Sequence, residues 1–116
     1  MNQEELTSLA LDYKTALLGE QESKFDVAEA QNNLEREKSL ALSVALSDGQ
    51  ITGKNAETRK IQESNVLEQC ERYRDTVAAA LLAEKTSAYT TVERQYFDVL
   101  IGLTKAWLYS QSGAGK

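Results

Sequence analysis

The sequence predicts an all-α protein in which two long antiparallel helices form a coiled-coil-like hairpin. Three observations lead to this prediction. The 116 residues include no proline, so long uninterrupted helices are permitted. The composition is rich in Ala, Leu, Glu, Gln, Lys and Arg, which favour helices and leave a thin apolar core. An Asp-Gly pair stands near the midpoint, where a bend between two helices is expected. The length is that of one domain, residues 1–116.

The first helix is expected to span about residues 3–47. Apolar residues recur there every seven positions and again three positions further on, which indicates a coiled-coil-like seam. Gly19 lies at the polar centre of this seam, and a kink or break is plausible at that point. The seam consists of Leu6, Tyr13, Glu20, Val27, Leu34 and Ala41, with Leu9, Ala16, Ser23, Ala30, Glu37 and Val44 three residues later.

The turn between the helices is expected at residues 48–52. Its sequence contains "DGQIT", which resembles part of a calcium loop, but three oxygen ligands of such a loop are missing. It also contains "GQITGK", in which three residues separate the two glycines, whereas a phosphate loop needs four. The segment is therefore interpreted as a bend. Gly49 suits the left-handed cap of the first helix, and Thr52 suits the N-cap of the second.

Three cations, Lys54, Arg59 and Lys60, gather near the start of the second helix. The helix dipole disfavours cations at that end, and its free N–H groups favour anions. The cluster is therefore a possible anion contact. Local pairing of Lys60 with Glu57 or Glu63 is the commoner explanation of such a cluster.

The second helix is expected to span about residues 53–110, followed by a flexible tail at 111–116. Its apolar residues recur every eleven positions, a period that indicates a straight helix. We expect these residues to form the core. They are Cys70, Leu81, Val92 and Leu103, together with Val66, Val77, Ala88 and Val99.

A hairpin folded at this bend places residue i opposite about residue 101 − i, so Tyr13 meets Ala88 and Leu34 meets Leu67. The most apolar segment, 97–110, then has no partner on the first helix. Either the N-terminal residues double back at Gly19, or the segment packs against another molecule. We expect a homodimer that forms a multi-helix bundle. The predicted interface residues are Tyr96, Val99, Leu100, Leu103 and Trp107.

The net charge of −5 is carried entirely by residues 1–47, which hold nine acidic and four basic side chains. This acidity argues against direct nucleic-acid binding, which requires a basic surface. The ordinary interpretation is a solvated face. The alternative is an acidic inhibitor or nucleic-acid mimic, whose face of Glu29, Glu35 and Glu37 binds a basic host protein.

The sequence predicts no catalytic residue, no metal site and no cofactor. It contains no histidine and one cysteine, Cys70. A nucleophile would therefore have no histidine as its base, and a zinc ion would lack the histidine and cysteine ligands that it usually has. We therefore expect a non-enzymatic protein. The acidic N-terminus does not fit a secretory signal, and the longest apolar runs are too short to span a bilayer. A cytoplasmic protein without a membrane segment is expected.

The stretch "DGQITGKNAETR", residues 48–59, resembles a turn found in small phage-type helical proteins of unknown function. The resemblance is confined to this turn. It implies a mobile-element context, in which small acidic proteins inhibit nucleases or host defences, and it implies no particular activity.

Overall fold

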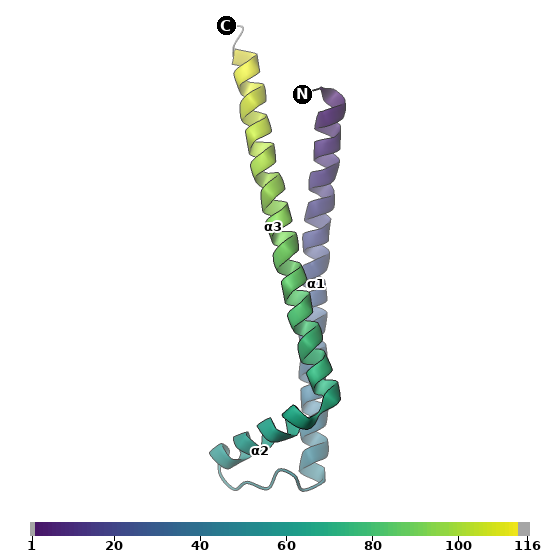
Figure 1. Cartoon of the computed structure of the whole chain (residues 1–116), viewed down its shortest axis with the longest axis vertical. Helices are drawn as coiled ribbons and strands as arrows, with labels where there is room; N and C mark the ends of the chain where they lie inside the picture. The colour runs from purple at the N-terminus through teal and green to yellow at the C-terminus, as the bar shows by residue number, and fades with distance from the viewer. Residues whose placement is uncertain (1, 114–116) are drawn as a thin grey trace. The chain divides into compact units, whose positions relative to one another are not determined.

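The computed structural model describes residues 2–113, and its regular secondary structure in that range is entirely helical. Helix α1 spans Gln3–Ser47, α2 spans Ala56–Gln69 and α3 spans Glu71–Gly113 (Figure 1). The prediction of an all-α protein with two long helices is confirmed. The bounds of α1 coincide with those expected for the first helix.

Helix α1 passes through Gly19 without interruption, so the break considered at this position does not occur. Glycine inside a helix costs about 1 kcal/mol relative to alanine, a penalty that neighbouring contacts can offset. Glu20 and Ser23 are 8% and 4% exposed, and each is hydrogen-bonded to a side chain of α3. The polar centre of the seam is therefore satisfied by partners, and the helix continues through it.

The end of α1 is a glycine cap, as predicted. Gly49 has a φ of 76°, in the left-handed region that favours glycine. The N–H of Gln50 donates to the carbonyl of Ala45 at 2.9 Å, and the N–H of Gly49 donates to the carbonyl of Leu46 at 3.3 Å. These two bonds form a Schellman motif, which satisfies carbonyls that the helix would otherwise leave without partners.

Helix α2 begins later than predicted, and its N-cap is Asn55, not Thr52. The Asn55 side chain accepts a hydrogen bond from the N–H of Thr58 at 2.8 Å. Thr52 instead belongs to a longer loop whose backbone is held by one side chain of α2. Gln62 Oε1 accepts from the N–H groups of Thr52 and Gly53 at 2.9 and 2.8 Å. This long-range anchor, rather than a local cap, organises the loop.

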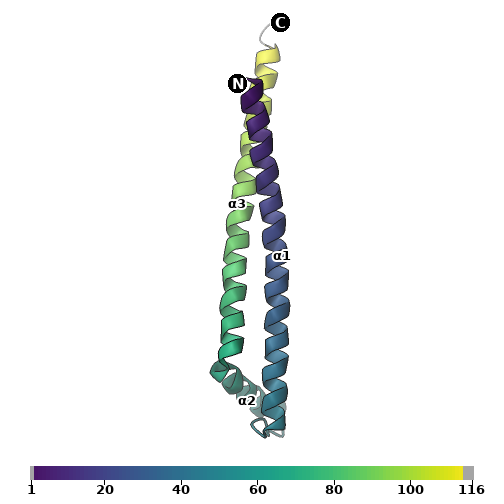
Figure 2. The same ribbon diagram turned by 90° about the vertical axis from the view of Figure 1, so that its right-hand side faces the viewer.

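The predicted second helix is interrupted at Cys70, which separates α2 from α3 (Figures 1 and 2). Cys70 has φ −88° and ψ 107°, so its backbone is extended. Its N–H still donates to Leu67 and its carbonyl still accepts from Arg74, so one residue makes the bend. Helix α3 then continues to Gly113, beyond the predicted end at 110. Of the expected tail, residues 111–113 are helical and 114–116 lie outside the described residues.

The contacts divide the chain into two compact units. Unit 1 contains the described parts of Met1–Phe25 and Lys85–Lys116, and unit 2 is Asp26–Glu84. In each unit a segment of α1 lies antiparallel to a segment of α3, and unit 2 also contains α2 (Figure 2). The α1 residues of the predicted seam are buried or half-buried, except Val44, whose place is taken by the buried Ala45.

The pairing register of α3 differs from the prediction in both units. In unit 1, the Tyr13 hydroxyl donates to the Asp98 carboxylate, ten residues beyond the expected Ala88. In unit 2, Gln31 Nε2 donates to Glu84 Oε1 at 2.8 Å. The bend at Cys70 is the reason, because the residues of α2 no longer extend the antiparallel pair. Consequently residues 97–104 of the segment do have a partner on α1, and the expected overhang is wrong for them, whereas residues 105–110 are exposed.

The face of α3 that packs on α1 in unit 1 is also different from the predicted one. Val92, Val99 and Leu103, assigned to the core by the eleven-residue period, are exposed. The face that packs inward follows a seven-residue period and is largely polar. It consists of Ser87, Thr90, Arg94, Phe97, Ile101 and Thr104, all half-buried.

Candidate functional site

A partly buried polar cluster occupies the centre of the unit 1 seam. Arg94 Nε donates to Glu20 Oε2 at 3.1 Å, and Arg94 also donates to the Asp98 carboxylate, which in turn accepts from Tyr13. One turn along α1, the hydroxyl of Ser23 lies 2.6 Å from that of Thr90. Each charged group thus has an opposite charge or a hydroxyl beside it.

The electrostatics of the cluster follow from these contacts. Desolvation raises the pKa of Glu20, but the hydrogen bond and charge of Arg94 outweigh it, and the net pKa is lowered. The Tyr13 hydrogen bond, followed by that of Arg94, lowers the pKa of Asp98. The same bond to Asp98 raises the pKa of Tyr13. Both carboxylates are therefore held ionised, which suits a structural role and not proton transfer near neutral pH.

The outward face of α3 in unit 1 carries a continuous row of large apolar and aromatic side chains. Its five residues are spaced alternately by three and four, and each is between 61% and 66% exposed. We call this row the α3 stripe, and it consists of Tyr89, Val92, Tyr96, Val99 and Leu103. At 100° per residue, it lies nearly opposite the face that packs on α1.

The predicted interface residues map onto this face. Tyr96, Val99 and Leu103 belong to the α3 stripe, Trp107 continues it one turn later, and Leu100 is half-buried at its edge. The sequence-based prediction missed Tyr89 and Val92. Val92 was assigned to the core, although its spacing of four and seven from Tyr96 and Val99 already placed it on the same face.

A second apolar row lies on the outward side of α1 in unit 1. Leu11, Leu18 and Phe25 are exposed and spaced by seven, so they share one face of the helix. We call these three residues the α1 stripe. With one large residue every two turns, it is much sparser than the α3 stripe.

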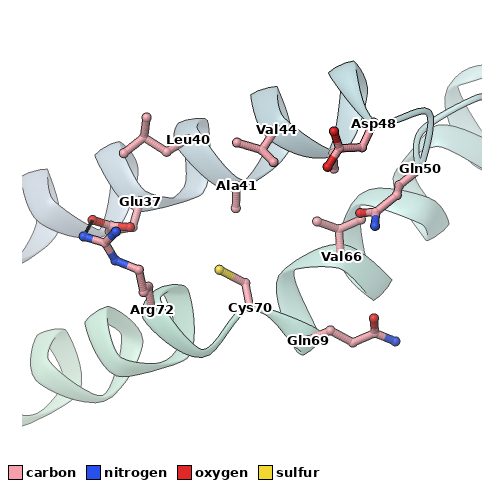
Figure 3. Close-up of a pocket in the computed structure, with 11 residues that line it drawn as sticks. Glu37, Leu40, Ala41, Val44, Asp48, Gln50, Val66, Gln69, Cys70 and Arg72 are labelled. Atoms are coloured by element: carbon pink, nitrogen blue, oxygen red, sulfur yellow. Dashed lines mark ion pairs between the residues drawn. The ribbon is translucent and has the colours of Figure 1, made fainter.

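Unit 2 contains a cleft of about 510 Å³ at the Cys70 bend (Figure 3). The Cys70 thiol points toward α1, and the ion pair of Glu37 with Arg72, 3.5 Å apart, lies at one end. Since the chain contains no histidine, the thiol has no imidazole to activate it. The other lining residues are Leu40, Ala41, Val44, Ala45, Asp48, Gln50, Val66 and Gln69. This lining suits an apolar contact and shows no catalytic arrangement.

The cations expected near the start of the second helix are not brought together by the structure. Arg59 Nε donates to the carbonyl of Gly53 at 3.0 Å, whereas Lys60 lines a separate hollow with Glu57. The N–H groups that an anion would use are partly engaged, because Asn55 caps α2 and Gln62 holds the loop. Lys54 is exposed and lies in the loop before α2.

The expected acidic face is dispersed around α1. Glu29 and Glu35 are exposed, whereas Glu37 is half-buried and paired with Arg72. At 100° per residue, the three positions point in different directions around the helix. They therefore form no continuous patch, and the acidic inhibitor stays a prediction of the sequence.

Within residues 2–113, no cluster of three Cys, Asp or Glu side chains has the geometry to hold a metal ion. None of the described helices is both long enough and apolar enough to cross a membrane. Comparisons with protein-family models, with curated proteins and with solved structures found no match to this chain.

Proposed function

We propose that this is a non-enzymatic helical interaction protein that self-associates through the α3 stripe. The observation that carries the proposal is the orientation of α3 in unit 1. Its most apolar face points outward, and a face containing Ser, Thr and Arg packs on α1. A solvated helix normally has the opposite arrangement, with its apolar face on the core.

The size of the exposed surface supports self-association. With the usual areas of these residues, the α3 stripe and Trp107 expose roughly 700 Å² per chain. The largest apolar patch of a typical monomeric protein is about 300–600 Å². Covering this area removes apolar surface from water, and this gain opposes the entropic cost of association.

The proposal extends to a second partner and to the setting of the protein. The α1 stripe gives the assembly a further apolar surface, through which it binds another macromolecule. A dimer of two such helical units is a multi-helix bundle. The expected cytoplasmic location and the absence of enzymatic activity belong to this proposal.

Sedimentation equilibrium over a range of micromolar concentrations tests self-association. We expect twice the chain mass for the unmodified protein and the chain mass for Leu103→Asp, because an aspartate in the interface is desolvated without a partner. Tyr109→Asp is the matched control. Tyr109 is exposed on the same helix but lies about a third of a turn from the α3 stripe, so this variant should stay dimeric.

Circular dichroism separates dissociation from unfolding, and Leu103→Ser provides a milder variant if the aspartate unfolds the chain. A helical, unmodified protein that keeps the chain mass at every concentration contradicts the proposal. Equal dissociation by Leu103→Asp and Tyr109→Asp also contradicts it, because the effect would then not depend on the α3 stripe.

A further inference from the structure

The α3 stripe has the spacing of a coiled-coil seam. Tyr89, Tyr96 and Leu103 take the a positions of consecutive heptads, and Val92 and Val99 take the d positions. This row runs along the helix for about 21 Å, at 1.5 Å per residue. A seam of this kind is suited to another helix, whose side chains fit between its own.

The area of the stripe matches the requirement of a stable dimer. Two copies joined through it and Trp107 would each cover up to roughly 700 Å² of exposed surface, within the range of about 600–1,000 Å² that one partner contributes to a specific interface. A much smaller row would leave association marginal. Together with Trp107, the α3 stripe is therefore large enough to be a complete interface.

The α1 stripe of another copy is a poorer occupant. It offers one large residue every two turns, so it cannot fill the spaces between the a and d side chains of α3. Contact between α3 of one copy and α1 of the next would also leave an α3 stripe uncovered at the end of every assembly that does not close into a ring. A stripe that pairs with itself closes after two copies.

The two directions in which a pair of α3 helices can run differ in their packing. A parallel pair would place Lys85, the d residue before Tyr89, against the partner's Lys85. An antiparallel pair can place each a residue opposite a d residue. Tyr96 then faces the partner's Val99, Val92 faces the partner's Leu103, and Tyr89 faces the partner's Ala106.

We propose that two copies join through their α3 stripes as an antiparallel, two-fold symmetric pair; this inference rests on the proposed self-association. Large residues then face small ones along the seam, which keeps its width even. The same arrangement brings the Lys85 ammonium within reach of the partner's Trp107, where a cation lies favourably over an indole ring. The parallel pair instead opposes two ammonium groups.

Disulfide trapping tests the direction in a chain whose native thiol is removed by Cys70→Ser. Val92→Cys and Leu103→Cys chains, one of them carrying a mass tag, are mixed while reduced and then oxidised. The antiparallel pair predicts that the mixed disulfide predominates. It also predicts little disulfide between two Val92→Cys chains, whose cysteines lie about 16 Å apart along the axis. Tyr109→Cys mixed with Val92→Cys is the matched control and should not crosslink.

The outcomes separate the inference from the proposed function. Predominant Val92→Cys self-disulfides in a dimer overturn the antiparallel direction but leave self-association standing. A dimer that gives neither disulfide means that another surface, such as the α1 stripe, forms the interface. This result overturns the pairing of one α3 stripe with another. A chain that remains monomeric by sedimentation overturns both proposals.

Discussion

Replacing Gly49 with alanine should destabilise the protein, because of the backbone conformation at the end of α1. Gly49 has a φ of 76°, and an added Cβ would meet no atom within 4 Å. The cost therefore comes from the backbone alone, and a left-handed conformation costs an L-residue about 1–2 kcal/mol. For a domain of this length, 1 kcal/mol corresponds to a fall in Tm of about 4 °C.

The matched control is Gly19→Ala, for which the opposite sign is expected. Gly19 lies inside α1, and an added Cβ would again meet no atom within 4 Å. Alanine should then stabilise the protein by about 1 kcal/mol, since it favours the helix and restricts the unfolded chain. The two variants should therefore differ by about 2–3 kcal/mol in the free energy of unfolding.

Chemical denaturation followed by circular dichroism measures both values. The chain concentration must be held constant, because the stability of an associating protein depends on it. An unchanged or raised stability of Gly49→Ala would refute the left-handed cap. Destabilisation by Gly19→Ala would show that α1 does not pass through this residue as a regular helix.

Asn55→Ala should lower the free energy of unfolding by about 1 kcal/mol, because Asn55 caps α2. Thr52→Ala should lower it by less. Urea denaturation of both variants checks this order, and a larger loss for Thr52→Ala contradicts it. Glu20 and Asp98 have pKa values lowered from 4.5 and 3.8, so the stability that they contribute is present above these values and lost as the pH falls through the lowered ones. Thermal unfolding at acidic pH should show this loss, and Glu20→Gln should diminish it; an identical pH profile for this variant argues against the cluster. Trp107 should become more accessible to a fluorescence quencher as the protein is diluted, because dissociation uncovers the α3 stripe, whereas quenching independent of concentration contradicts an interface there.

The sequence was sufficient to predict α1 because its signals are local. Its seam follows one seven-residue period, and the burial of Leu6, Tyr13 and Ala16 agrees with it. The cap at Gly49 was likewise predictable, since a single residue type suits that backbone. The choice between Thr52 and Asn55 as N-cap could not be predicted, because both side chains can cap a helix. The conformation of the loop depends on Gln62, which lies ten residues from Thr52 and accepts a hydrogen bond from its N–H.

The orientation of α3 could not be read from its own periodicity. Its apolar residues do recur regularly, but they form the outward stripe. The inward face is selected by α1, whose Glu20 and Ser23 require partners that Arg94 and Thr90 supply. Such complementarity across many residues is invisible in the pattern of one helix. The break at Cys70 had no local signal either, since neither glycine nor proline is present there.

The residues of the candidate interface were predicted more successfully than the reason for their exposure. The spacing of Tyr96, Val99, Leu103 and Trp107 placed them on one face of a helix, and the structure exposes that face. The predicted reason, an overhang beyond the first helix, was wrong for residues 97–104, which pack on α1. The grouping of Lys54, Arg59 and Lys60 rested on nearness in sequence, whereas Lys54 lies in the loop before α2 and the Arg59 side chain donates to the carbonyl of Gly53.

The pairing within unit 1 has a consequence for the kinetics of folding. Its contacts join residues 67, 74 and 85 positions apart, in the pairs Ser23–Thr90, Glu20–Arg94 and Tyr13–Asp98. Isolated helices form within about a microsecond, whereas docking must first close a long loop. This chain should therefore fold more slowly than helical proteins whose contacts are local. In refolding followed by pulsed hydrogen exchange, residues 3–25 should gain full protection only when residues 85–113 dock against them.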